Sequence, residues 1–193
     1  MPDAERKKWQ AIHAERGFFP REPSTVITAL ERFLPHTPAT ALDVAGGTGR
    51  HAFWLAERGF EPTLVDISST AIHIAQTEAA SRGIQLSTVS ADLVSAPLPP
   101  GPWHLIVCFH YLHRPLVAQF ADGLAPGGVL VMVQPTVRNL ERHPRPGRRF
   151  LLEEDELPDL AAAANLGVVD YQEDWSHEGR HEAALVARRP PET

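Results

Sequence analysis

Residues 41–56, with the sequence ALDVAGGTGRHAFWLA, decide the fold of this chain. The apolar run 41–44 predicts a buried strand, which a cluster of glycines then breaks. An amphipathic helix is predicted from about Arg50 to Gly59, because glycine tolerates the left-handed conformation at a helix end. A strand, a glycine turn and a helix together indicate a ligand-binding loop, since the backbone can approach a ligand and the helix start offers unpaired N–H groups.

Two motifs fit this glycine turn. Residues 47–52 fit G-x-G-x-x-A, one form of the dinucleotide fingerprint. Read from Asp43, the turn is D-x-A-x-G-x-G, with Ala45 at the place of the first glycine. The second pattern resembles the first motif, D/E-x-G-x-G-x-G, of Rossmann-like S-adenosylmethionine (SAM) methyltransferases. A tight turn without a ligand is the third interpretation.

Length and composition favour one globular domain that covers residues 1–193, with residues 1–38 as an N-terminal helical cap region. The 193 residues are enough to bury a core, and 43% of them are apolar and 22% charged. The net charge of −6 argues against a nucleic-acid partner bound through a general basic surface. The charged N-terminus, the lack of a membrane-length apolar run and the single cysteine, Cys108, favour a cytoplasmic protein without a membrane partner. The oligomeric state stays open.

Helices alternate with strands along most of the chain, which predicts a parallel sheet covered on both faces. The last two strands are close enough in sequence for an antiparallel hairpin. We therefore expect an α/β fold: a Rossmann-like, doubly wound, mainly parallel seven-stranded sheet with a C-terminal antiparallel β-hairpin. The expected strands are 41–44, 61–65, 86–90, 104–109, 129–133, 167–175 and 182–188, with a turn at 125–128 and a late helix at 153–164.

Two acids end neighbouring predicted strands. Asp66 follows the second strand, where a carboxylate can accept hydrogen bonds from ribose hydroxyls. SAM and NAD both contain a ribose, so Asp66 supports either cofactor, and helix capping is the alternative role. The third strand ends in Ala91-Asp92-Leu93, which resembles the methyltransferase motif that holds the adenine amino group. The run 124–130 resembles the L-x-P-G-G-x-L turn of the same superfamily.

A narrower resemblance extends over nearly the whole chain. The match to small bacterial methyltransferases of the tellurite-resistance and thiol-methyltransferase-like group is a resemblance carried by residues 49–50, 54–59, 65–68, 105–109, 111–116, 150–152 and 185–189. The chain departs from them at residues 45–47 and 133–136, and the second departure borders the expected acceptor pocket. The predicted cofactor-binding residues are Arg16, Asp43, Ala45, Gly46, Gly47, Gly49, Asp66, Ile67, Ala91, Asp92, Leu93 and Phe109. Trp9 and His13, near Arg16, are expected to close over the cofactor.

Methyl transfer from a sulfonium is an in-line displacement that needs no protein nucleophile, only an acceptor atom held ~3–3.5 Å from the methyl carbon. The candidate catalytic residues are His110, Tyr111 and His113, which follow the fourth strand. Imidazole titrates near neutrality, so either histidine could be a general base for a phenol or an amine, whereas an acidic thiol would need none. Capping of the following turn is the alternative for the histidines, and packing is the alternative for Tyr111. No metal site is predicted.

A basic segment, residues 136–149, follows the fifth strand. It contains five arginines and one acid, Glu141, so five minus one gives a local charge of +4. One hypothesis is a lid that attracts an anionic acceptor, and the other is a solvated surface loop. Together these observations predict a SAM-dependent methyltransferase with a small-molecule acceptor. An NAD(P)-dependent oxidoreductase and a non-catalytic SAM-binding regulatory protein are the alternatives.

Overall fold

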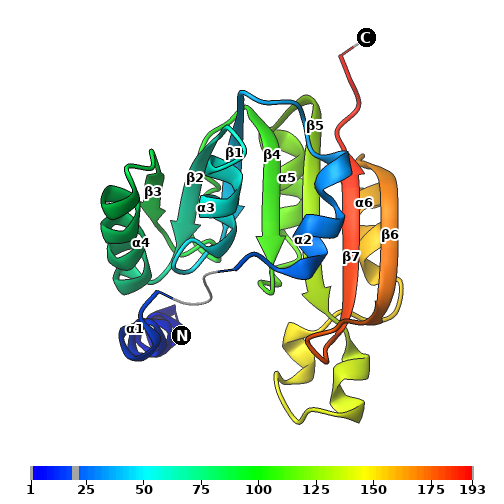
Figure 1. Cartoon of the computed structure of the whole chain (residues 1–193). Helices are drawn as coiled ribbons and strands as arrows, with labels where there is room; N and C mark the ends of the chain where they lie inside the picture. The colour runs from blue at the N-terminus through cyan, green and yellow to red at the C-terminus, as the bar shows by residue number, and fades with distance from the viewer. Residues whose placement is uncertain (1, 19–21, 193) are drawn as a thin grey trace.

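The computed structural model describes residues 2–18 and 22–192, so residues 19–21 of the predicted cap region, and residues 1 and 193, lie outside the described residues. A seven-stranded sheet with the order β3-β2-β1-β4-β5-β7-β6 runs through the molecule (Figure 1). Strands β1 to β5 are parallel, and β7 is antiparallel to both β5 and β6, which confirms the predicted fold class. The strands are β1 (Ala39–Val44), β2 (Phe60–Asp66), β3 (Ser87–Ser90), β4 (Trp103–Phe109), β5 (Leu124–Pro135), β6 (Gly167–Trp175) and β7 (His181–Arg188).

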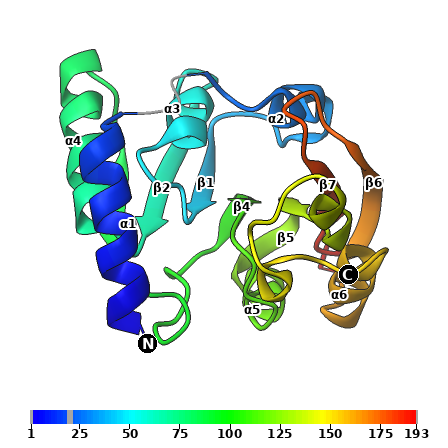
Figure 2. The same cartoon turned by 90° about the horizontal axis from the view of Figure 1, so that it is seen from below.

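Helices cover both faces of this sheet (Figure 2). On one face, α2 (Thr25–Ala29) and α3 (Arg50–Ala56) pack on the central strands, while α4 (Ser69–Arg82) packs on β2 through an adjoining cluster. On the other face, α5 (Leu116–Gly123) and α6 (Glu156–Ala163) pack on the same strands. Burial on both faces explains why β1 and β4 are nearly continuous apolar runs.

Two element boundaries differ from the sequence-based expectation. Strand β5 begins at Leu124, and the expected turn at 125–128 is an irregularity within it, where the pairing with β4 shifts between Trp103 and Leu105. Helix α6 begins at Glu156 rather than at residue 153, because Asp155 adopts a left-handed conformation with φ 55°. Such a residue cannot continue a right-handed helix.

The N-terminal helix α1 (Pro2–Arg16) lies across the edge of the sheet at which β1 and β2 end (Figures 1 and 2). It packs on α4, and the Gln10 side chain donates a 3.0 Å hydrogen bond to the Ser69 hydroxyl. Residues 136–155 extend beyond the same edge below β5 and β7, and include the short helices η2 (Val137–Glu141) and η3 (Arg148–Phe150). In the described part of the chain, no helix is long and apolar enough to cross a membrane.

Candidate functional site

The glycine turn between β1 and α3 is shaped by left-handed backbone and by a buried carboxylate. Ala45, Gly47 and Gly49 have φ values of 52°, 58° and 94°. Ala45 therefore occupies a conformation that favours glycine, which explains why the resembling motif has glycine there. A Cβ on Gly46 would lie only 2.5 Å from Asp43 Oδ2. That oxygen accepts a 3.0 Å hydrogen bond from the backbone N–H of Ala52, so Asp43 holds the turn against the first residues of α3.

Asp43 lies inside the protein rather than on the edge of the sheet. Its burial raises the pKa of the carboxyl to about 7, and the hydrogen bond from Ala52 opposes this shift. The structure thus places Asp43 where it supports the turn from within. Direct contact between Asp43 and a cofactor stays a prediction.

Asp66 ties the end of β2 to the glycine turn. Its Oδ2 accepts a 2.9 Å hydrogen bond from the Gly47 N–H, and its Oδ1 accepts a 2.8 Å bond from the Ser68 N–H. Burial raises the pKa of Asp66, and these backbone donors oppose the shift. Ile67 follows directly and is partly buried. The carboxylate therefore lies beside the turn, where ribose hydroxyls would replace or add to its donors.

Asp92 is a second acceptor one strand further along the edge. The backbone N–H of Ala91 donates to the Asp66 carbonyl at 3.0 Å, which aligns the ends of β2 and β3. Asp92 Oδ1 accepts a 3.1 Å bond from the Val94 N–H, and Leu93 is buried in the core below. Carboxylates accept hydrogen bonds from the hydroxyls of a ribose and from the amino group of an adenine. The donor and acceptor chemistry of this edge therefore fits an adenosine.

The N-terminal helix brings one further side chain to this edge. A Cβ on Gly47 would lie 3.3 Å from the His13 ring, so His13 lies against the turn. Burial lowers the pKa of His13, while the nearby Asp66 opposes the shift. Trp9 stacks on His13 at a ring-centroid distance of 5.8 Å, and Arg16 is exposed. The positive charge of Arg16 also lowers the pKa of His13, and its role in binding a cofactor stays a prediction.

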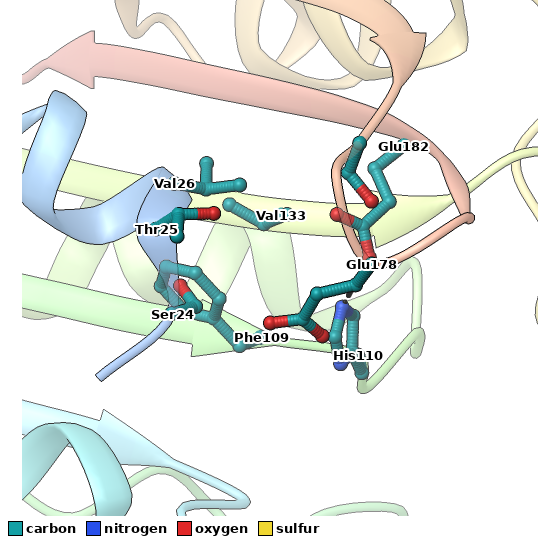
Figure 3. A pocket seen from close by; sticks show the side chains of 9 residues that line it. Ser24, Thr25, Val26, Phe109, His110, Val133, Glu178 and Glu182 are labelled. Atoms are coloured by element: carbon teal, nitrogen blue, oxygen red, sulfur yellow. Dashed lines mark hydrogen bonds and ion pairs between the residues drawn. The ribbon is translucent and has the colours of Figure 1, made fainter. Parts of the chain in front are cut away.

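A small pocket opens next to the end of β4. It contains about 220 Å³ of empty space, which includes space open to solvent. Figure 3 shows Ser24, Thr25 and Val26 at one end and His110, Glu178 and Glu182 at the other, with Phe109 and Val133 between them. Almost none of this space could hold a water molecule, so the lining side chains would have to move apart to admit a ligand.

His110 and Glu182 are paired at the rim of this pocket. His110 Nε2 lies 2.7 Å from Oε1 of Glu182, whose side chain is only 7% exposed. Arg180 lies 4.0 Å from the same carboxylate, and Glu178 is paired with both Arg180 and Arg50. Sequence analysis missed Glu182, because it lies 72 residues from His110 and belongs to no local motif.

His51, in the first turn of α3, is the other functional candidate that sequence analysis missed. Its ring contacts the Phe109 ring at a centroid distance of 4.1 Å. Its Nε2 is buried and has no hydrogen-bond partner among the described residues. Burial, with smaller contributions from Arg50 and His110, lowers the pKa of His51 to about 3. The ring is therefore neutral near neutral pH.

The remaining candidates after β4 lie differently. Tyr111 packs against the core, and burial raises the pKa of its hydroxyl, which therefore keeps its proton near neutral pH. His113 is partly buried, and its carbonyl accepts the 2.9 Å bond that begins α5. Arg114 forms a bidentate ion pair with Glu156, and thus anchors α6. Of the predicted catalytic residues, the structure brings His110 to the pocket.

Most arginines of residues 136–149 form an ion pair or a cation–π contact with a neighbouring side chain. Arg145 is the exception, with no ionic or ring partner in the described part of the chain. The others pair as Arg138–Glu141 and Arg148–Glu153, or lie over an aromatic ring as Arg142 over Trp175 and Arg149 over Phe150. The loop therefore presents less unpaired positive charge than its composition indicates. Among residues 2–18 and 22–192, no group of three metal-ligating side chains converges.

Known proteins share both this fold and the central part of the sequence. Residues 41–128 match the model of a methyltransferase domain family. Over 113 residues, the chain is 30% identical to a demethylmenaquinone methyltransferase from Thermus thermophilus. The aligned segment covers 55% of this chain and 51% of that protein. The chain thus spans about half the length of the curated relatives it matches.

Solved structures agree with this match at the level of the fold. A SAM-dependent methyltransferase from Methanosarcina mazei is 20% identical with a TM-score of 0.68, over 89% of this chain and 100% of that one. TehB from Haemophilus influenzae is 20% identical with a TM-score of 0.69, over 85% of this chain and 61% of that one. The matched segment begins in β1, includes the glycine turn, Asp66 and Asp92, and ends in β5.

Proposed function

We propose that the chain transfers a methyl group from SAM to a small-molecule acceptor, because residues 41–128 match a methyltransferase domain family and the fold is that of SAM-dependent methyltransferases. The observation that carries the proposal is the alignment of the glycine turn with Asp66 and Asp92 at one edge of the sheet, directly beside the pocket at Phe109. When bound, SAM supplies an electrophilic methyl group on a positively charged sulfur.

The chain's own residues would hold this cofactor in two ways. Asp66 and Asp92 would accept hydrogen bonds from the ribose and the adenine, with Ile67 and Leu93 beside the ring. Ala45, Gly46, Gly47 and Gly49 would form the turn against which the amino-acid end lies, and Asp43 would keep that turn in shape. His13 would cover the edge from α1. Arg16 is the least supported member of the predicted set.

The acceptor would occupy the pocket lined by Phe109 and Val133, and His110 is the best-placed candidate for a general base. The Thermus thermophilus relative is a demethylmenaquinone methyltransferase, and this supports a small-molecule acceptor. The predicted preference for an anionic acceptor has less support, because four of the five arginines of residues 136–149 have partners and the pocket holds two carboxylates. The lone cysteine, buried in β4, supports a reducing, cytoplasmic setting.

Calorimetric titration with SAM, S-adenosylhomocysteine and NADH tests this proposal. We expect both sulfur nucleosides to bind, and Asp66→Ala to weaken SAM at least tenfold because a buried acceptor of the ribose is lost. Asp159→Ala, which removes an exposed acid on α6, is the control and should bind as the wild type does. Binding of NADH alone would favour an oxidoreductase. SAM binding without turnover to S-adenosylhomocysteine on any acceptor would favour a regulatory protein.

A further inference from the structure

The pair of side chains at the pocket rim narrows the class of acceptor. We propose that His110 and Glu182 together remove the proton from a neutral, weakly acidic hydroxyl group, so that the acceptors are phenols or enols rather than ionised thiols or oxyanions. The inference rests on the proposed methyltransferase function and adds to it the chemical class of the acceptor. Its basis is geometry, charge and burial at the end of β4.

The hydrogen bond between the two side chains fixes which ring nitrogen is the base. An ionised carboxylate can only accept hydrogen bonds, so Nε2 of His110 is the donor in the 2.7 Å contact with Glu182. The lone pair of the neutral imidazole is therefore on Nδ1. Glu182 would also stabilise the imidazolium that forms when Nδ1 takes up a proton. Glu182 is thus a positioning residue, and Nδ1 of His110 is the atom that accepts the proton.

The backbone holds this ring in an uncommon conformation. His110 has a φ of 57°, in the left-handed region that non-glycine residues rarely adopt. Its N–H donates a 2.9 Å hydrogen bond to the carbonyl of Val133, so β5 holds its backbone while β7 holds its side chain. Strained residues persist where their surroundings over-determine them, and they cluster at functional sites. The ring is thereby held at the pocket that Phe109 and Val133 line.

The charges around the pocket disfavour an anionic acceptor. Two carboxylates, Glu178 and Glu182, line it, and the nearby cations Arg50 and Arg180 are already paired with them. Val26, Phe109 and Val133 give the pocket apolar surface, and Ser24, Thr25 and Ser176 add hydroxyl groups. A neutral molecule with an apolar body and a hydroxyl group is compatible with this lining.

Acidity then distinguishes between kinds of hydroxyl. An ionised thiol needs no base, so a His–Glu pair would serve no purpose for it. A phenolic hydroxyl, with a pKa of ~10, is within reach of an imidazole base, whereas an aliphatic hydroxyl close to water at ~15.7 is not. In the step, the acceptor oxygen bonds to the methyl carbon and the carbon–sulfur bond breaks with its electron pair going to sulfur. The hydroxyl proton goes to His110 Nδ1 and then to solvent.

The activity test compares acceptors that need a base with one that does not. The probes are phenol, catechol and 1-naphthol, with ionised thiophenol as the matched acceptor, and the product is S-adenosylhomocysteine. We expect His110→Gln to lower kcat for the phenols by about 100-fold and Glu182→Gln by about tenfold, with KM little changed. Any kcat for ionised thiophenol should be unaffected by either variant. Glu31→Gln removes a carboxylate–arginine pair outside the pocket lining and should leave all rates unchanged.

The outcomes separate this inference from the proposed function. Failure to bind SAM would refute methyl transfer itself. SAM binding without turnover of any phenol, or equal losses for phenols and thiophenol in both variants, would refute the acceptor class alone. A ¹⁵N spectrum of the wild-type protein gives a readout that needs neither turnover nor a variant. We expect a protonated Nε2 and an unprotonated Nδ1 in neutral His110, and the opposite tautomer would overturn the assignment.

Discussion

Replacement of Gly46 by alanine tests the packing beneath the glycine turn. The added Cβ would lie 2.5 Å from Asp43 Oδ2 and 2.6 Å from its Cγ, closer than van der Waals contact allows. Asp43 is buried, so its carboxylate cannot swing into solvent to make room. The carboxylate must instead move away and weaken its 3.0 Å hydrogen bond to the Ala52 N–H.

Two effects lower the free energy of unfolding of this variant. Overpacking a core position costs ~1–3 kcal/mol, and loss of a hydrogen bond costs ~0.5–1.5 kcal/mol. We therefore expect the free energy of unfolding to fall by about 3 kcal/mol. At roughly 2.1 cal/mol/K per residue, the unfolding entropy of 193 residues is about 0.4 kcal/mol/K, so Tm should fall by about 7 °C.

Thermal unfolding followed by circular dichroism measures this difference. Gly147→Ala is the matched control, because its φ is −65° and nothing lies within 4 Å of its added Cβ. The control should change Tm by less than about 2 °C. If Gly46→Ala melted at the same temperature as the control, Asp43 would not be packed against the turn as described, and the explanation for a glycine at this position would be wrong.

Three further predictions concern buried or paired groups. Burial raises the pKa of Asp43 to about 7 from 3.8, so the folded chain keeps a proton that the unfolded chain loses above about pH 4. Stability should therefore fall between about pH 4 and pH 7 by up to about 4 kcal/mol relative to Asp43→Asn, as urea unfolding across this range would measure; parallel pH profiles would contradict it. The Cys108 thiol, whose pKa burial raises, should not react with a thiol reagent until the protein unfolds, and rapid labelling at neutral pH would contradict its burial. Arg114→Met should lower Tm by only about 2–3 °C. The arginine side chain is 39% exposed, so its ion pair with Glu156 contributes about 1 kcal/mol to stability. A fall in Tm of more than 10 °C would contradict this small contribution.

Local patterns were sufficient to predict the parallel part of the fold. The apolar runs and the glycines mark β1 to β5 and the helices between them, and the structure confirms that order. The topology then brings Asp66 and Asp92 to one edge, because parallel strands that are neighbours end together. These features could be predicted because each depends on residues that are close in sequence.

The features that sequence analysis missed depend on contacts between distant residues. Nothing in the local sequence distinguishes His51 from other helical histidines, and only the structure shows its ring in contact with Phe109. Nothing in the local sequence distinguishes Glu182 from other strand residues, and its position at the pocket depends on the pairing of β7 with β5. The left-handed conformation of Asp155, which delays α6, has no marker in the sequence because the residue is not glycine. Propensity and periodicity describe neighbours along the chain, and none of these contacts is local.

The reversed direction of β7 has a consequence for how the protein assembles. Because this strand runs against its neighbours, its first residues, and not its last, lie at the edge where β4 and β5 end. Its early residue Glu182 thereby meets His110, with 72 positions between them. Closing so long a loop is slow, and a chain synthesised from its N-terminus could order the glycine turn before β7 exists. A nascent chain could thus form the glycine turn well before the pocket rim is complete.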